Sequence, residues 1–97
     1  MENIQGSKYL ELKPYTKTYM KAFGYGLHDF VACELCGAKA VDIHHIEARG
    51  MGGSKEKNDI DNIMALCRGC HLEYGDKKQH KEYLTERHFY FMKINGL

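Results

Sequence analysis

The feature that most constrains this chain is a pair of Cys-x-x-Cys motifs, "CELC" at 33–36 and "CRGC" at 67–70. This spacing lets both thiolates of a tight turn face one ion, and four thiolates in a tetrahedron are an arrangement that Zn²⁺ prefers. A chain of 97 residues buries a thin core and usually needs such a staple. The motifs therefore predict one structural zinc ion, with no coordination position open for a substrate, held by Cys33, Cys36, Cys67 and Cys70.

The same cysteines permit other chemistry: two disulfides, a redox dithiol, or covalent attachment of a c-type haem at "CRGCH", 67–71. The N-terminal "MENIQGSKYLELKPYTK" has no apolar secretory segment, and no later apolar run is long enough to span a bilayer. We therefore expect a cytoplasmic protein without a membrane partner. In a reducing compartment structural disulfides are disfavoured, and haem attachment is normally completed elsewhere, so we expect zinc and no haem. A thioredoxin-type motif would also need a βαβ pattern, which is missing.

The N-terminal part predicts a helix. Pro14 suits the first turn of a helix, and Gly24 would end it. Lysines share one face of this helix, and aromatic side chains recur every four residues on another. We expect the aromatic face to pack on the core rather than to follow a phosphate backbone; it consists of Tyr15, Tyr19 and Phe23.

The middle of the chain predicts a β-hairpin. "AKAVDIHHI" at 38–46 is short and rich in β-branched residues, and "NIMALC" at 62–67 can pair with it across a polar loop at 48–59. A short helix should then stop at Gly75, and a longer one should begin with Asp76 as N-cap, with Gln79 completing a capping box. Together these elements predict one α+β domain over 1–97, divided into an N-terminal extension 1–31, a core motif 33–75 and a C-terminal helix 76–93.

The histidines between and after the cysteine pairs are candidates for chemistry. Adjacent residues of a regular strand point to opposite faces, so His44 and His45 can serve one centre only if the strand ends or bends there. His71 would lie in the first turn of the helix after the second cysteine pair. The other histidines lie in periodic, polar surroundings and are expected to be ordinary surface or satisfied core residues: His28, His80 and His88.

The segment "CELCGAKAVDIHHIEARGMGGSKEKNDIDNIMALCRGCH", 33–71, resembles the HNH endonucleases of the His-Me finger, or ββα-metal, superfamily. The positions that give the family its name match His45, Asn62 and His71, and the cysteine pairs match its zinc-stapled branch. The resemblance implies a small zinc-stabilised ββα-metal domain with flanking N- and C-terminal helices. It also implies hydrolysis of DNA phosphodiester bonds to 5′-phosphate and 3′-hydroxyl products.

The resemblance implies a role for each matched residue. His45 would be the general base that takes a proton from water, His44 and His71 would bind one catalytic divalent metal, and Asn62 would brace the loop that holds the base. Many members have Asp where His44 stands, and some with a histidine pair add a third ligand where this chain has Gly75. Asp42 is either a carboxylate that orients a ligand ring or a solvated strand residue.

Metal preference and DNA contact follow from the same residues. Imidazole ligands favour Mn²⁺, Ni²⁺, Co²⁺ or Zn²⁺ at least as well as Mg²⁺. The net charge of +1 gives no global bias toward nucleic acid, so contacts must be local and weakly sequence-specific. The candidates are the lysines of 8–21 and 77–81 together with Arg49, Lys55, Lys57 and Arg68. A non-catalytic zinc module that binds nucleic acid or protein is the alternative. Oligomeric state, and nicking as opposed to double-strand cleavage, stay open.

Overall fold

A two-stranded antiparallel sheet lies at the centre of the computed structural model, which describes residues 12–26, 28–47, 59–75 and 77–97. Strand β1 (Asp42–His45) pairs with β2 (Ile63–Leu66), in a register that places His44 opposite Met64. The predicted hairpin is confirmed, although both strands are shorter than 38–46 and 62–67.

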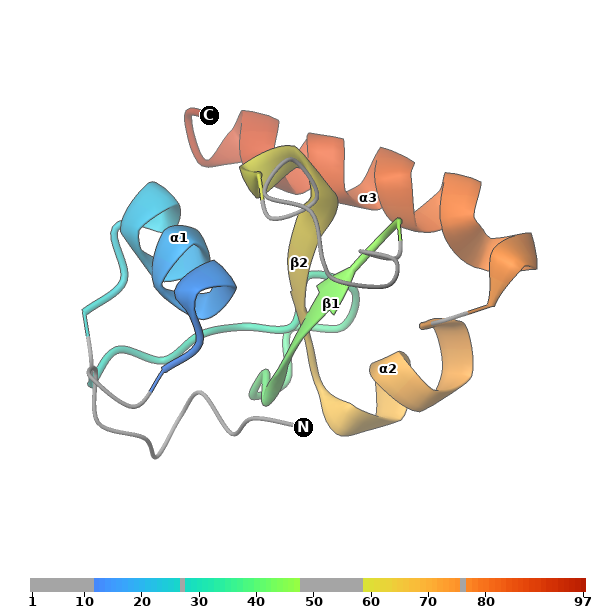
Figure 1. Ribbon diagram of the computed structural model, residues 1–97, viewed down its shortest axis with the longest axis horizontal. Helices are drawn as coiled ribbons and strands as arrows, with labels where there is room; N and C mark the ends of the chain where they lie inside the picture. The colour runs from blue at the N-terminus through green and yellow to red at the C-terminus, as the bar shows by residue number, and fades with distance from the viewer. Residues whose placement is uncertain (1–11, 27, 48–58, 76) are drawn as a thin grey trace.

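Helices surround this hairpin. In Figure 1, α1 (Pro14–Phe23) and α2 (Arg68–Tyr74) lie on opposite sides of it, and α3 (Lys81–Ile94) runs across the top of the view. Short 3₁₀ turns, η3 (Ile60–Asn62) and η4 (Lys78–His80), precede β2 and α3. The part of the chain that the structure describes is thus a small α+β fold, and none of its helices is long and apolar enough to cross a membrane.

Helix α1 begins and ends where the sequence predicts. Pro14 occupies the first turn, and Gly24 caps the C-terminus with a left-handed φ of 74°, which glycine adopts without a Cβ clash. The aromatic face packs inward as expected: Tyr19 is fully buried and Phe23 contacts Phe91 of α3, with ring centres 5.3 Å apart.

The start of α3 differs from the prediction. The helix begins at Lys81 with His80 as its N-cap, and no side chain caps it. Gln79 lies in the preceding turn η4, so the expected helix start at 76 is wrong; Asp76 itself lies outside the described residues. The 3₁₀ turn takes the place of the expected first helical turn. Its lysine, Lys78, lies beside the end of β1.

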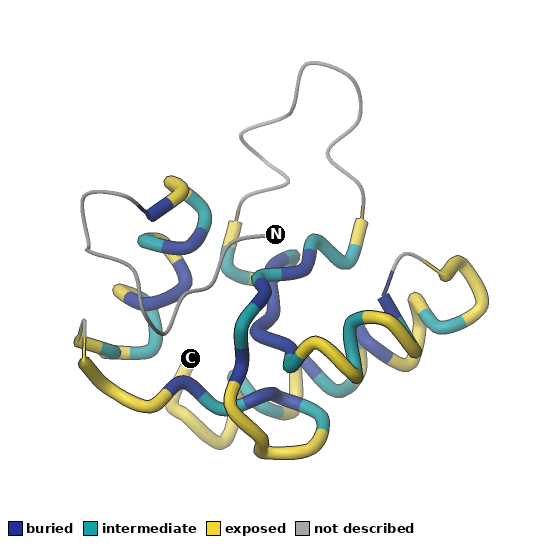
Figure 2. Tube along the Cα trace, turned by 90° about the horizontal axis from the view of Figure 1, so that it is seen from below, coloured by how far each residue is buried: buried dark blue, intermediate teal, exposed yellow. Residues whose placement is uncertain are grey.

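Strand β2 is buried on both faces and organises the core (Figure 2). Its alternate side chains enter different clusters: Ile63 and Ala65 pack with Tyr19 of α1, whereas Met64 and Leu66 pack with Leu84 of α3 and with Cys33. The hairpin is therefore held between the helices, and the first cysteine is part of the core.

A buried polar network joins the same elements. The Tyr19 hydroxyl donates to Glu34 Oε2 at 2.5 Å, and the backbone N–H of Ala65 donates to the same oxygen at 3.2 Å. His88 Nδ1 of α3 lies 2.7 Å from Glu34 Oε1. His88, expected to be an ordinary residue, is a fully buried one with hydrogen-bond partners.

Candidate functional site

The four cysteine thiols converge as the motif spacing predicts. Their sulfur atoms all lie within 4.8 Å of one another, and the sulfurs of Cys36 and Cys67 are 3.6 Å apart. Four sulfurs at about 2.3 Å from a tetrahedral zinc ion would be separated by about 3.8 Å. None of the four cysteines forms a disulfide. The donor set and its geometry therefore fit a structural zinc ion.

The first cysteine pair lies in a tight turn fixed to β2. Gly37 has a φ of 80°, which allows its N–H to donate to the Cys33 carbonyl at 2.9 Å. The N–H of Cys33 donates to Ala38, and the N–H of Glu34 donates to the Ala65 carbonyl at 3.0 Å. The turn is thus attached to the strand that carries both core clusters.

The second cysteine pair forms the start of α2. Cys67 is the N-cap, and its sulfur accepts a hydrogen bond from the Cys70 N–H at 3.4 Å. Burial raises the pKa of the Cys67 thiol, but the Cys70 N–H and the neighbouring thiols outweigh burial and lower it overall. This favours the thiolate, which is the form that binds metal. His71 follows at once in the first turn of α2.

Asp42 connects β1 to α2. It is 2% exposed, and it accepts a hydrogen bond from Arg68 Nε at 3.0 Å. His71 Nδ1 lies 3.1 Å from the same carboxylate oxygen. Since an ionised carboxylate can only accept, Nδ1 of His71 is the donor, and in the neutral ring Nε2 then presents a lone pair. Of the two alternatives for Asp42, the structure shows the carboxylate that orients a ring.

His44 and His71 meet beside Asp42. Their ring centres are 5.0 Å apart with an angle of 59° between the planes, and His44 is 4% exposed. Two imidazoles that share one metal at about 2.1 Å, at near-tetrahedral angles, have ring centres about 5 Å apart. The pair therefore fits a divalent metal ion, for which imidazole nitrogen is a suitable ligand.

Gly75 packs directly against His71. A Cβ on Gly75 would lie 2.6 Å from the backbone oxygen of His71 and 3.2 Å from its Nε2, and would overlap ring carbon Cδ2. The resemblance to the HNH endonucleases implies a third ligand at this position in some members, and this chain has no side chain there. The absence of a side chain keeps the His71 ring in place.

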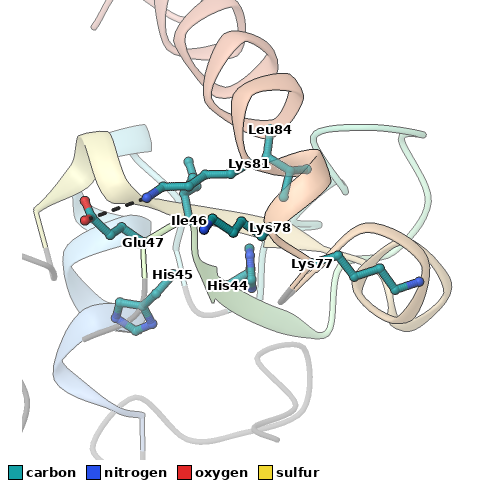
Figure 3. A pocket seen from close by; sticks show the side chains of 8 residues that line it. All are labelled: His44, His45, Ile46, Glu47, Lys77, Lys78, Lys81 and Leu84. Carbon is teal, nitrogen blue, oxygen red and sulfur yellow. Dashed lines mark ion pairs between the residues drawn. The ribbon is translucent and has the colours of Figure 1, made fainter. Parts of the chain in front are cut away.

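His45 lies at the end of β1, which satisfies the condition for adjacent histidines to face one site. Its ring packs edge-on against Tyr15 of α1, with centres 4.7 Å apart. Both His44 and His45 line a cavity of about 460 Å³ (Figure 3). His71 is not among the described residues that line this cavity, and its ring packs against the His44 ring. The rest of the lining comes from the end of the hairpin, η4 and the start of α3: Ile46, Glu47, Lys77, Lys78, Lys81 and Leu84.

Asn62 holds the chain just after His45. Its Oδ1 accepts from the Glu47 N–H at 2.8 Å, and its Nδ2 donates to the Glu47 carbonyl at 3.1 Å. The Ile46 N–H donates to the Asn62 carbonyl at 2.9 Å. The two side-chain bonds fix the backbone on both sides of the Glu47 Cα, at the exit of β1.

The candidate DNA-contacting residues differ in where the structure places them. The Arg68 guanidinium is 51% exposed but is paired with Asp42, so it helps to position His71. The pairing of Arg68 with Asp42 and the contact of Tyr15 with His45 were not predicted from the sequence. Strand alternation offered one signal, because it places residues 42 and 44 on the same face. Three further candidates lie outside the described residues: Arg49, Lys55 and Lys57.

Comparison with known proteins gives one match. The family model of the HNH endonucleases matches residues 33–77. This range begins at the first zinc-ligand cysteine and ends just after α2, so it contains the hairpin, both cysteine pairs and all three histidines of the site. No significant match was found among curated proteins or among solved structures.

Proposed function

Residues 33–77 belong to the HNH endonuclease family, and from this premise we propose that the chain is a metal-dependent endonuclease that hydrolyses DNA phosphodiester bonds. The observation that carries the proposal is the meeting of the His44 and His71 rings, 5.0 Å apart, with His44 and His45 lining one cavity. A protein that only needed a zinc-stabilised fold would have no use for this second cluster of ligands.

In the proposed reaction His45 is the general base. A water molecule attacks phosphorus, its proton passes to the imidazole, and the bond from phosphorus to the 3′-oxygen breaks. The products are a 5′-phosphate and a 3′-hydroxyl, whose proton comes from solvent. An imidazole is suited to this exchange because an unperturbed histidine has a pKa of about 6.5, close to neutral pH. The edge contact with Tyr15 limits rotation of the His45 ring.

His44 and His71 would hold the catalytic divalent ion. When bound, it would neutralise charge on the phosphate and on the leaving oxygen. The chain contributes the orientation of the ligands: Asp42 fixes the His71 ring, and Arg68 fixes Asp42. Asn62 is assigned a bracing role, since its bonds to Glu47 fix the backbone that follows His45.

The four cysteines would hold zinc for structure alone, in the reducing cytoplasm where thiols persist. Each chain would offer one catalytic site, so we expect nicked circles to form first. Phosphate contacts of the kind proposed position the duplex without reading its sequence, so specificity should be weak.

A plasmid cleavage assay with the zinc-loaded protein tests the proposal. Supercoiled DNA should be cut with added Mn²⁺, Ni²⁺, Co²⁺ or Zn²⁺ at least as well as with Mg²⁺, because the ligands are imidazoles. His45→Ala should abolish cutting, while His28→Ala, at an exposed position, should cut like the wild type. A folded, zinc-loaded protein that cuts with none of these metals, or a His45→Ala variant that cuts normally, would reject the proposal.

The alternative, a zinc module that binds nucleic acid or protein without catalysis, is separated by metal stoichiometry. The nuclease should bind a second metal equivalent beyond the structural zinc, and His44→Ala or His71→Ala should lose it. Binding of a single equivalent that survives both substitutions would favour the non-catalytic module.

A further inference from the structure

Three lysines form one wall of the cavity that contains His44 and His45: Lys77, Lys78 and Lys81. Lys78 lies in η4, and Lys77 and Lys81 flank it, so the 3₁₀ turn sets the directions of their side chains. Among the described residues of the lining, Glu47 is the only acidic one. The described part of the lining therefore carries excess positive charge before any metal is bound.

Two of these lysines are engaged elsewhere. Lys77 Nζ donates to the Glu73 carbonyl at 2.7 Å, and Figure 3 shows its side chain directed away from the histidines. Lys81 Nζ lies 3.7 Å from Glu47 Oε1, where it offsets the carboxylate charge. Both groups are exposed, so this ion pair adds little stability. Its effect is to cancel the one negative charge of the lining.

Lys78 differs from its neighbours. Within the part of the chain that the structure describes, its ammonium makes no ion pair and no side-chain hydrogen bond. In Figure 3 its side chain extends over β1 toward Ile46, above the His44 and His45 rings. The side chain is exposed, so the charge is available to a ligand without a burial cost.

We propose that Lys78 is a catalytic residue that binds a non-bridging oxygen of the scissile phosphate. This inference rests on the proposed nuclease function and adds a named cation to it. A phosphodiester carries one negative charge, and attack by hydroxide adds another as phosphorus becomes five-coordinate. An ammonium held close to those oxygens is attracted more strongly to the transition state than to the ground state, and this difference accelerates the reaction.

Lysine is suited to this task because its ammonium is a point charge on a flexible stem, which can follow an oxygen as the phosphate inverts. His45 would remove the proton from water, and His44 with His71 would bring the metal. Lys78 would then supply neutralising charge from the η4 side of the cavity.

The test compares Lys78→Gln with Lys78→Arg and with the control Lys93→Gln, at an exposed position in the last turn of α3, in single-turnover cleavage at saturating DNA. We expect Lys78→Gln to be slower by roughly 100-fold, the lower end of the loss for one stabilising donor. Lys78→Arg should recover most of the rate, and Lys93→Gln should cut within about two-fold of the wild type. A Lys78→Gln enzyme that cuts at the wild-type rate overturns the proposal.

A binding measurement separates this inference from the nuclease proposal. In the His45→Ala background and without divalent metal, DNA affinity is measured against salt concentration. Loss of one phosphate contact should reduce the slope of log K against log salt by about one. That reduction in Lys78→Gln, and not in Lys93→Gln, supports the contact even if the wild type fails to cut. An unchanged slope in Lys78→Gln overturns the contact even if the wild type is an active nuclease.

Discussion

His88 Nδ1 lies 2.7 Å from Glu34 Oε1, and neither side chain is exposed to solvent. The other ring nitrogen, Nε2, lies 2.5 Å from the carbonyl oxygen of Ile60. A carbonyl oxygen can only accept, and the carboxylate already accepts from the Tyr19 hydroxyl and the Ala65 N–H. Both ring nitrogens therefore act as donors, which makes His88 an imidazolium in a buried ion pair. The pair links α3 to the first cysteine turn and to the 3₁₀ turn before β2.

Removal of one partner should destabilise the fold strongly. His88→Ala leaves the buried Glu34 carboxylate without its counter-charge, and such a loss costs about 3–5 kcal/mol. The unfolding free energy, measured by urea titration with zinc present, should fall by that amount. The exposed His28→Ala is the control and should change it by less than about 0.5 kcal/mol. A loss below about 1 kcal/mol in His88→Ala would show that the pair is not a buried charge pair.

The same pair should make stability depend on pH. Burial lowers the pKa of His88, but the hydrogen bond and charge of Glu34, the Ile60 carbonyl and the charge of Asp61 outweigh burial and raise it. A raised pKa in the folded state stabilises the protein fully below the unfolded value of about 6.5, and this stabilisation is lost as pH rises through the folded pKa.

The quantity to measure is the difference in unfolding free energy between the wild type and His88→Gln, from about pH 6 to about pH 9. It should be largest at the acidic end and shrink as pH rises. Ionisation of the cysteines and zinc binding affect both proteins alike and cancel in the difference. A difference that grows with pH would contradict a raised His88 pKa.

Local patterns predicted the elements of this fold but not the contacts between distant ones. Pro14 and Gly24 bound α1 because proline and glycine set the backbone directly. His88 offered no comparable signal: it shares a face of α3 with Leu84 at helical spacing, yet a polar residue there reads as solvated. Its burial follows from the approach of Glu34, which is distant in sequence.

In the candidate site, too, the residue types could be predicted from local sequence, but the contacts between distant elements could not. The cysteine spacing and the order of the histidines follow from sequence, because ligand chemistry needs those residue types. The edge contact of Tyr15 with His45 joins α1 to the end of β1 and depends on how the helix packs. The predicted start of α3 at Asp76 failed because a 3₁₀ turn precedes the helix, and that turn brings Lys78 to the site.

Removal of zinc should unfold the chain. Four thiolates join two turns on either side of the hairpin, and binding to a structural site of this kind contributes about 10–16 kcal/mol. A strong chelator should abolish the helical circular dichroism signal, and added Zn²⁺ should restore it. Cys36→Ser should bind zinc weakly, while the control Thr85→Ser, which keeps the hydroxyl bonded to the Lys81 carbonyl, should bind zinc normally. A chelated protein that stays folded would contradict a structural role, and a Soret band would indicate haem.

Loss of the Asn62 amide should slow cleavage more than it destabilises the fold. Asn62→Ala removes the bonds to the backbone N–H and carbonyl of Glu47, so the chain after His45 gains freedom. Each such bond contributes only about 1 kcal/mol to stability, whereas misplacement of a base can cost about 100-fold in rate. Asn95→Ala, which breaks a side-chain bond to Phe91 at the end of α3, is the control. Equal cleavage rates in the two variants would show that Asn62 does not support the position of His45.

Gly75→Ala tests the position of the His71 ring without replacing any metal-ligand residue. The backbone of Gly75 has φ −71° and ψ 149°, which any residue adopts, so alanine introduces no backbone strain. Its Cβ would overlap the His71 ring and lie 2.6 Å from the His71 carbonyl oxygen, so the imidazole must move.

We expect Gly75→Ala to keep its structural zinc and to bind the second metal about 10- to 100-fold more weakly, as when the support of a ligand is lost. Isothermal titration with Mn²⁺ or Co²⁺ measures the affinity, and cleavage should fall with it. Gly69→Ala is the matched control in the same helix, because its Cβ would meet only the Cys67 sulfur at 4.0 Å, an ordinary contact. If Gly75→Ala binds the second metal as tightly as Gly69→Ala does, His71 is not a ligand of that metal.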